Sequence, residues 1–266
     1  RGSVAAVLGT ISFFIFARDG DFRRVILVTS GITFVVGFLV RAFVPDDTSK
    51  GGRTPFRGAL KEINSLLGRR NIWLLSLIII CAYSGYKITD DFSLFAREVL
   101  GFSESSAAGV GTAALWLRAI TAVLAGYLAD RYRKANIITV CFALSAVGAL
   151  LIGSGLVDSV IFLIFMNLIL TAVGIYGIRA LYFAVLKEAG IPYVLTGTAV
   201  GIVSFAGYTP EVFMGPWMGY LLDRSPGPEG HAHVFLLLAV FAMIGLVAGI
   251  LFSKIQDHPD IAGGMS

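Results

Sequence analysis

Charged residues are scarce in this sequence. Only 14% of the 266 residues are Asp, Glu, Lys or Arg, whereas soluble domains carry roughly 25%. Water cannot solvate such a surface over most of its area, so a soluble globular fold is excluded. Because 56% of the residues are hydrophobic, membrane lipid is the expected partner of most of the surface.

Cysteine and the motifs of enzymes are also lacking. The two cysteines, Cys81 and Cys141, lie in apolar runs, where we expect small hydrophobic side chains rather than a disulfide or metal ligands. No phosphate-binding glycine loop, nucleophile elbow, acid–base pair or metal-type histidine spacing occurs. The basic residues are spread over loops without interleaved aromatics. We therefore expect no enzyme activity, cofactor, metal or nucleic-acid partner.

Long apolar runs are what the sequence does contain. Each has about twenty residues, which suffices to cross a hydrocarbon slab of ~30 Å. This pattern predicts an all-α, polytopic transmembrane helical bundle of about eight spans. The expected spans are 1–17, 24–44, 72–95, 104–129, 135–156, 158–186, 194–222 and 232–254. Because the chain opens with Arg1-Gly2-Ser3 and no methionine, we expect a fragment whose upstream part is missing.

The one long connection, residues 45–70, predicts both a surface helix and an orientation. Phe56, Leu60 and Ile63 recur at helical spacing beside basic residues, which favours an amphipathic helix on the membrane surface. Thirteen of the 21 Lys and Arg residues fall on the side of this linker, five fall opposite, and three lie inside spans. By the positive-inside rule, the linker and the C-terminus are cytoplasmic, and the protein is a multi-pass protein of the cell (inner) membrane.

A weak internal repeat divides the last six spans. The run Gly126–Arg131 (GYLADR) recurs 93 positions later as Gly219–Arg224 (GYLLDR). Ser84–Lys87 similarly lies 92 positions before Tyr176–Arg179. With three spans per unit, the second copy must be inverted in the membrane, as in the 3+3 inverted repeats of many secondary transporters.

Three pairs of glycines have the spacing that permits close helix crossing. They are Gly197/Gly201, Gly215/Gly219 and Gly245/Gly249. We expect all three pairs to pack against neighbouring helices.

The run Gly126–Lys134 (GYLADRYRK) resembles the cytoplasmic loop signature of the major facilitator superfamily, roughly G-x-L-A-D-R-aromatic-G-R-K. It departs from that signature because the glycine expected between Tyr132 and Arg133 is missing, which leaves the turn geometry open. The resemblance implies a gating role for Gly126, Asp130, Arg131, Arg133 and Lys134. The alternative is that the basic residues only flank the membrane.

The same resemblance implies a domain organisation. The visible spans would be the fifth to twelfth helices of the family, with the first four absent. The implied parts are the last two helices of the N-terminal half (1–44), the central linker (45–70), the C-terminal six-helix half (71–256) and a cytoplasmic tail (257–266).

Two further segments carry a narrower resemblance. Arg179–Phe183 and the region from Thr196 to Glu211 are similar to poorly characterised bacterial permeases near the sugar-phosphate and organic-anion carriers. This implies a small anionic solute as the substrate.

Charged residues inside the spans are the candidate site, because an ionised side chain at the bilayer centre costs at least ~2.5–3.5 kcal/mol. The expected substrate-binding residues are Lys87, Arg118, Arg179, Tyr86, Tyr176, Tyr182, Tyr208 and Trp116. The expected proton-coupling residues are Asp90, Asp91 and Glu211. Both aspartates follow Lys87 on one helical face, and Glu211 follows Pro210, where desolvation favours the protonated carboxyl.

Structural roles for the same residues stay open at this point. Lys87 can form a fixed ion pair with the aspartates, Arg118 a fixed bridge between helices, and Glu211 a permanent buried pair, while Arg179 can extend to the membrane surface. The predicted function is secondary active transport of a small anionic organic solute by alternating access, coupled to protons. The alternatives are a transporter-like membrane sensor and a drug-efflux carrier.

Overall fold

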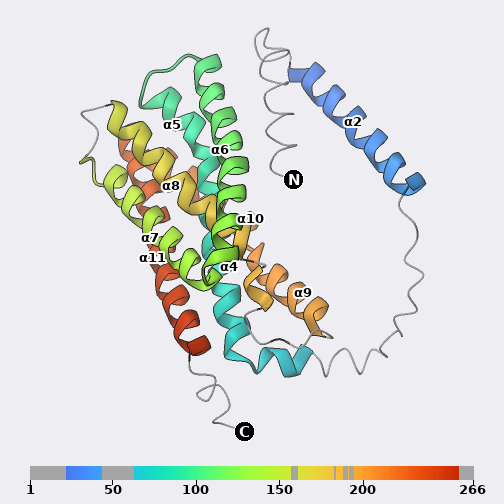
Figure 1. Cartoon of the computed structure of the whole chain (residues 1–266). Helices are drawn as coiled ribbons and strands as arrows, with labels where there is room; N and C mark the ends of the chain where they lie inside the picture. Colours follow the sequence, from blue (N-terminus) through green and yellow to red (C-terminus); the bar gives the residue numbers. More distant parts are fainter. Residues whose placement is uncertain are drawn as a thin grey trace.

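The computed structural model describes residues 22–43, 63–156, 161–182, 184–187, 191 and 195–257, and the described part is helical without any strand (Figure 1). The expected span 1–17 and most of the linker 45–70 lie outside these residues. The elements are α2 (Phe22–Phe43), α4 (Arg70–Ile88), η2 (Thr89–Asp91), α5 (Phe92–Glu98), α6 (Glu104–Arg131), α7 (Lys134–Gly153), α8 (Ile161–Leu181), η3 (Ala184–Lys187), α9 (Thr196–Gly207), α10 (Pro210–Arg224) and α11 (Pro228–Asp257).

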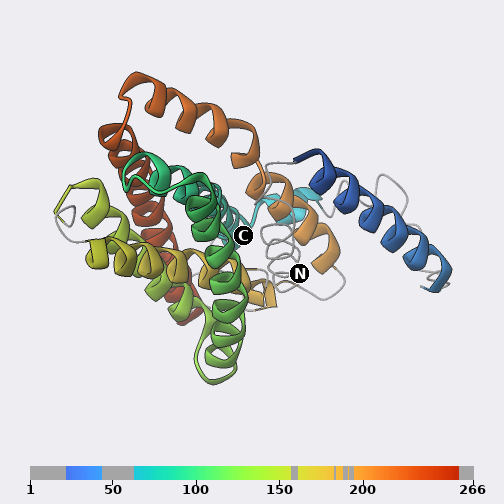
Figure 2. The same cartoon turned by 90° about the horizontal axis from the view of Figure 1, so that it is seen from above.

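Five of the described helical segments are long and apolar enough to cross a membrane. They are Arg70–Glu98, Glu104–Arg131, Lys134–Gly153, Ile161–Leu181 and Pro228–Ile255. α4 to α11 gather into one bundle, and α2 stands apart from it in both views (Figures 1 and 2). The predicted all-α transmembrane bundle is therefore confirmed.

The expected span 194–222 is not one unbroken helix, because the structure divides it into α9 and α10. α9 ends at Gly207, and the Thr209 hydroxyl donates a hydrogen bond to the Ala206 carbonyl at 2.7 Å. Pro210 then opens α10. Proline lacks an N–H and its ring clashes with the preceding turn, so the first turn is where a helix accommodates it without losing a hydrogen bond.

The segment Arg70–Glu98 also has an irregular point, the 3₁₀ turn η2 at Thr89–Asp91. A 3₁₀ helix advances by three residues per turn rather than 3.6. This tighter winding directs Asp90 and Asp91 to different neighbours, as described below.

α7 lies at the centre of the packing, between α8 and α11. A Cβ atom added to Gly174 would overlap Ser145 of α7, and one added to Gly245 would overlap the Phe142 ring. α4 closes the other side, where a Cβ at Gly85 would lie 3.2 Å from Leu238 and 3.3 Å from Ile175. The approaches at Gly174 and Gly245 leave no room for a side chain, and together with the contacts of Gly85 they position the helices that bear the candidate site.

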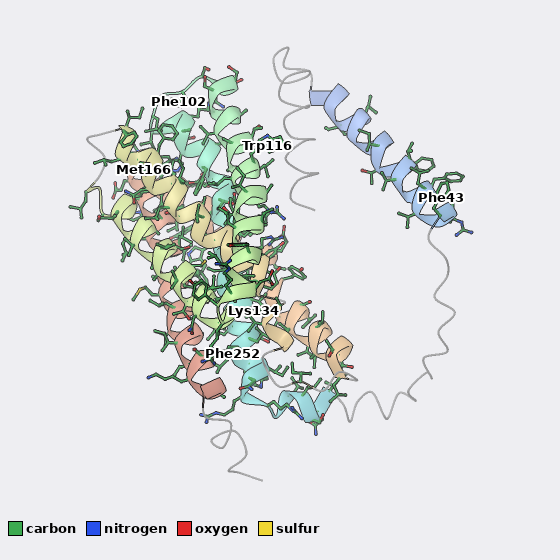
Figure 3. The ribbon with its side chains drawn as sticks, in the orientation of Figure 1. Phe43, Phe102, Trp116, Lys134, Met166 and Phe252 are labelled. Carbon is green, nitrogen blue, oxygen red and sulfur yellow. The ribbon has the colours of Figure 1, made fainter. Side chains whose placement is uncertain are left out.

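The bundle has two chemically distinct ends. α7 and α11 run antiparallel, because Ser253 donates a hydrogen bond to Asn136 at 2.8 Å and Gly153 lies against Leu236. Arg70, Arg131, Lys134 and Lys254 therefore belong to one end, here called the basic end, as the predicted alternation of spans requires. In Figure 3, Lys134 and Phe252 lie toward this end and Phe102 lies at the opposite end.

Candidate functional site

Three side chains on one face of α4 form the base of the candidate site. Tyr83, Tyr86 and Lys87 are spaced by three and four residues, so they share a helix face. The rings of Tyr83 and Tyr86 have centroids 5.7 Å apart. Around them gather Arg118, Arg179, Tyr208 and Glu211 from neighbouring helices, and we call these seven residues the tyrosine–cation cluster.

Arg179 of α8 lies on both rings. Its guanidinium carbon is 3.7 Å from the Tyr86 ring centroid and 5.1 Å from that of Tyr83. A cation over an aromatic face is stabilised by the ring quadrupole. Its buried Nη1 has no hydrogen-bond partner among the described protein atoms. A buried guanidinium nitrogen without an acceptor is costly, so this corner of the cluster favours an anion.

Arg118 of α6 reaches the same tyrosine. Its Nη1 donates to the Tyr86 hydroxyl at 3.1 Å, and its guanidinium carbon is 5.1 Å from the ring centroid. Two guanidinium groups from different helices thus converge on one side chain. The ion pairs found among the described residues involve neither of them.

Lys87 pairs with two carboxylates instead, Glu211 of the cluster and Asp90 just outside it. Its ammonium lies 3.0 Å from Asp90 and 3.3 Å from Glu211. The Tyr83 hydroxyl also donates to Glu211 at 2.7 Å. Counting Lys87, Arg118 and Arg179 against Glu211 and the neighbouring Asp90 leaves one net positive charge at this site.

The expected desolvation of Glu211 is wrong. Its side chain is 55% exposed, and it keeps two partners, Tyr83 and Lys87. The reason is the division of the span: Glu211 stands in the first turn of α10, just after the break, rather than inside a continuous helix.

Asp91 does not join Lys87, although both aspartates were expected on its face. The 3₁₀ turn directs Asp91 to His231 of α11, whose Nδ1 lies 2.9 Å from its carboxylate. Asp90 alone of the two keeps the contact with Lys87. The last expected span, 232–254, excluded His231, whereas the structure places this residue in the first turns of α11.

The other predicted aromatic residues lie in different surroundings. Tyr208 belongs to the cluster, because its ring meets that of Tyr83 edge-on at 5.0 Å. Tyr176 and Tyr182 are each 3% exposed and lie in the hydrophobic core, and Tyr182 also borders the cluster through a side-chain hydrogen bond with Tyr208. Trp116 is 42% exposed on α6.

Sequence reasoning missed Tyr83, which touches four members of the cluster. The available signal was its position one turn before Tyr86 and Lys87 on the same helix face. Its contacts with Glu211 and Tyr208 come from residues more than a hundred positions away, so no local pattern could reveal them.

The residues with the expected gating role lie at the basic end. α6 contains Gly126 and Asp130 and ends at Arg131, Arg133 caps the start of α7, and Lys134 is its first residue. The Arg131 guanidinium lies 5.1 Å from the ring centroid of Tyr127, one turn earlier. The tight two-residue connection forms without the family's glycine; the gating role stays a prediction.

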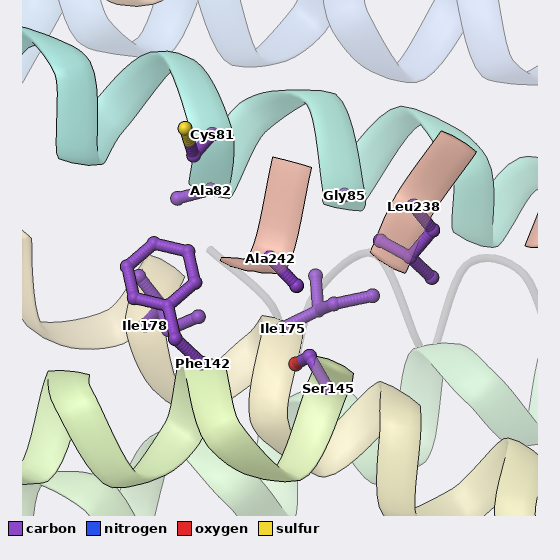
Figure 4. Close-up of a pocket in the computed structure, with 9 residues that line it drawn as sticks. All are labelled: Cys81, Ala82, Gly85, Phe142, Ser145, Ile175, Ile178, Leu238 and Ala242. Carbon is purple, nitrogen blue, oxygen red and sulfur yellow. The ribbon is translucent and has the colours of Figure 1, made fainter. Parts of the chain in front are cut away.

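A small void lies in the core of the bundle, between α4, α7, α8 and α11 (Figure 4), and no residue of the cluster lines it. Its volume is about 10 Å³, and its lining includes Gly85, Phe142, Ile175 and Leu238. That is room for one water at most, and the walls are largely apolar. It cannot hold an organic solute, so the tyrosine–cation cluster remains the candidate site.

Comparison with known proteins gives related inner membrane proteins. The chain is 27% identical to the inner membrane protein YqcE of Escherichia coli K12 over 96% of its own length and 64% of the relative. It is 26% identical to YihN of the same organism, over 96% and 63%. The chain therefore spans slightly less than two thirds of these relatives.

A solved structure shares the fold. It is a bacterial homologue of the human lysosomal transporter Spinster in an inward-facing, unoccupied conformation, with a TM-score of 0.61 and 16% identity over 95% of this chain and 64% of that one. The model of the Major Facilitator Superfamily matches residues 2–177, well over half of the chain. With the helical bundle and the GYLADRYRK loop, this match shows that the chain belongs to the Major Facilitator Superfamily.

Proposed function

We propose that the protein is a secondary transporter that moves a small anionic organic solute across the cell membrane by alternating access, with protons as the coupling ion. Family membership supports transport, and the relatives' description as inner membrane proteins supports the location. The basic end is then the cytoplasmic end, by the positive-inside rule. The chain spans slightly less than two thirds of its relatives, so residues of the whole protein that lie outside it would supply the rest of the solute site.

The observation that carries the anionic substrate is the pair of guanidinium groups on Tyr86. Neither has a carboxylate partner among the described ion pairs, and the Arg179 Nη1 is buried without an acceptor. Guanidinium forks match carboxylate and phosphate oxygens in bidentate geometry. An oxyanion on Arg118 and Arg179 would satisfy the open donor and neutralise the excess charge.

Proton coupling is supported by the way Glu211 is held. Its carboxylate accepts from Tyr83 and pairs with Lys87, and more than half of its side chain is exposed. A solute anion at the cluster competes with this carboxylate for Lys87. Protonation of Glu211 removes that competition, so proton and anion would bind together.

The test is uptake by proteoliposomes containing the full natural chain. Labelled glycerol 3-phosphate, a hexose phosphate and gluconate serve as anionic probes, and glucose serves as the neutral one. Uptake of at least one anion is expected, with a loss of about tenfold or more in Arg179→Gln, because a charge-assisted hydrogen bond is worth about 1.5–3 kcal/mol.

Arg224→Gln is the matched control, since Arg224 also contacts a tyrosine, Tyr220 at 2.9 Å, but lies outside the cluster. Uptake of glucose alone, or equal uptake by both variants, would overturn the anionic assignment.

Two other functions have their own outcomes in this assay. A membrane sensor would bind an anion and support no counterflow of the same labelled anion. A drug-efflux carrier would move apolar cations instead, and Arg179→Gln would not impair it.

A further inference from the structure

A second polar cluster lies at the end of the bundle opposite the basic end. His231 of α11 is completely buried, with Nδ1 2.9 Å from an Asp91 carboxylate oxygen and Nε2 3.1 Å from a Glu98 carboxylate oxygen. Asp91 is 2% exposed and Glu98 43% exposed. We call these three residues the histidine–carboxylate cluster. It joins η2 and α5 to the first turns of α11.

Aromatic rings enclose the histidine on its apolar side. Phe95 meets the imidazole edge-on with centroids 5.6 Å apart, and Phe235 meets Phe95 at 5.4 Å. Phe92 stacks on Phe235 at 6.0 Å. Glu98 is thus the member of the cluster through which solvent is reached.

The hydrogen count of this cluster is the main observation. A neutral imidazole has one N–H, and an ionised carboxylate has none to donate. Because each ring nitrogen lies against a carboxylate oxygen, a neutral ring between two ionised carboxylates would leave a nitrogen lone pair facing an oxygen lone pair. One more proton converts that repulsion into a second hydrogen bond, and in a buried site the difference is large.

The charges that act on the ring come from the cluster itself. Asp91 and Glu98 are the ionisable groups that face His231 among the described residues. Lys87 and Asp90 on α4 and η2 pair with each other, and Arg97 of α5 pairs with Glu104 of α6 at 3.0 Å. Arg224, at the end of α10, donates to Tyr220. The charges acting on the imidazole are therefore both negative.

We propose that His231, Asp91 and Glu98 form a proton-binding site, in which the ring is held as imidazolium between two carboxylates and the bound proton fastens α11 to the α4–α5 segment. The proton comes from water through Glu98 and returns by the same route, with no other bond made or broken. Asp90 and Asp91 are adjacent, so the same 3₁₀ turn bears a residue of this site and a residue bound to Lys87. The site is separate from the proposed solute site and needs no solute to be detected.

The first measurement needs no substitution. The full chain is labelled with ¹⁵N-histidine in lipid nanodiscs, and the ring nitrogens are observed by NMR at about pH 7.5, above the ordinary pKa of histidine near 6.5. Both nitrogens of His231 are expected to carry hydrogen. The His231→Gln variant assigns the signal. A neutral His231 in the unaltered protein would overturn the proposal.

Glu98→Gln gives a sharper second test. The amide that this substitution introduces can donate to Nε2, so a neutral ring that donates from Nδ1 to Asp91 has both hydrogen bonds without the extra proton. The variant is expected to show neutral His231 at about pH 7.5. Because Glu98 is 43% exposed, the change should not prevent folding.

Glu104→Gln is the control, because it removes a carboxylate from the same end of the bundle and leaves the cluster intact. Its His231 is expected to remain an imidazolium. The same signal in Glu98→Gln as in the unaltered protein would mean that Glu98 does not hold the proton, which contradicts the proposal.

Thermal unfolding gives an independent readout. The bound proton stabilises the unaltered protein at low pH, and this contribution is lost as the pH rises. A fall in Tm of about 2–4 °C per kcal/mol lost is expected between about pH 7 and about pH 9. Glu98→Gln should lose this difference relative to the unaltered protein, and Glu104→Gln should keep it. Equal pH dependence in all three proteins would also overturn the proposal.

Discussion

Tyr86 is contacted by two guanidinium groups from different helices. Arg179 rests on its ring, and Arg118 both faces the ring and donates to its hydroxyl. The ring contacts both guanidinium groups, whereas the hydroxyl binds only Arg118 of the two, so substitution can separate the two contributions.

Tyr86→Leu is expected to weaken anion uptake by about 2- to 30-fold, since a cation–π contact contributes roughly 0.5–2 kcal/mol. Tyr86→Phe keeps the ring under Arg179, so a smaller loss is expected. The measurement is the KM for the anion found to be transported in proteoliposomes. Equal losses in the two variants would show that the hydroxyl, rather than the ring, positions the arginines.

Glu211→Gln tests the coupling residue. The amide cannot exchange a proton at neutral pH, but it can still accept the Tyr83 hydrogen bond. Exchange of labelled anion across the membrane should persist, whereas accumulation driven by a pH gradient should be lost. Glu229→Gln, an exposed carboxylate in the first turn of α11, is the matched control. Gradient-driven accumulation that survives Glu211→Gln would exclude Glu211 as the coupling residue.

Only one of the three glycine pairs packs against a neighbouring helix among the described residues. Gly245 and Gly249 of α11 lie against Phe142 and Thr139 of α7, as expected. A Cβ at Gly197, Gly201, Gly215 or Gly219 would have nothing within 4 Å. For those two pairs the expected packing is wrong among the described residues, because the faces of α9 and α10 that bear them point away from the bundle.

Gly245→Ala is therefore expected to destabilise the protein by about 1–3 kcal/mol, since the methyl group overlaps the Phe142 ring in a close-packed interface. Gly215→Ala meets no atom in the bundle and improves helix propensity by about 1 kcal/mol. Thermal unfolding in detergent compares the two. A destabilised Gly215→Ala would indicate that a segment outside the described residues packs on that face.

The helices were predictable because apolar runs of membrane length are a local property of the chain. The breaks were harder: the 3₁₀ turn at Thr89–Asp91 has no distinctive residue, and it separated the aspartates that helical spacing had placed together. Arg118 and Arg179 could be singled out as buried charges. Their convergence on Tyr86 depends on how α4, α6 and α8 pack against one another. This packing cannot be predicted from the sequence of any one helix.

At the scale of the whole molecule, the two copies of the internal repeat occupy opposite ends. Gly126–Arg131 ends α6 beside the start of α7, and Gly219–Arg224 ends α10 beside the start of α11. The antiparallel pairing of α7 and α11 places these points at opposite ends of the bundle. That arrangement is what an inverted repeat requires.

Cysteine labelling tests the orientation of the bundle in the membrane. Arg133→Cys, at the basic end, is expected to react with an impermeant thiol reagent only after cells are permeabilised. Pro226→Cys, in the exposed turn before α11, is expected to react from outside. Cys81 and Cys141 are buried, so the unaltered chain, which contains only these two cysteines, measures the background labelling. The reverse labelling pattern would invert the proposed topology.

Tyr83 contacts both sides of the break between α9 and α10. Tyr208, at the end of α9, presses on its ring, and Glu211, at the start of α10, holds its hydroxyl. Since no continuous helix joins the two halves rigidly, either can tilt alone, but a tilt of one relative to the other must disturb at least one of these contacts. The contacts of the Tyr83 side chain therefore depend on the angle between α9 and α10.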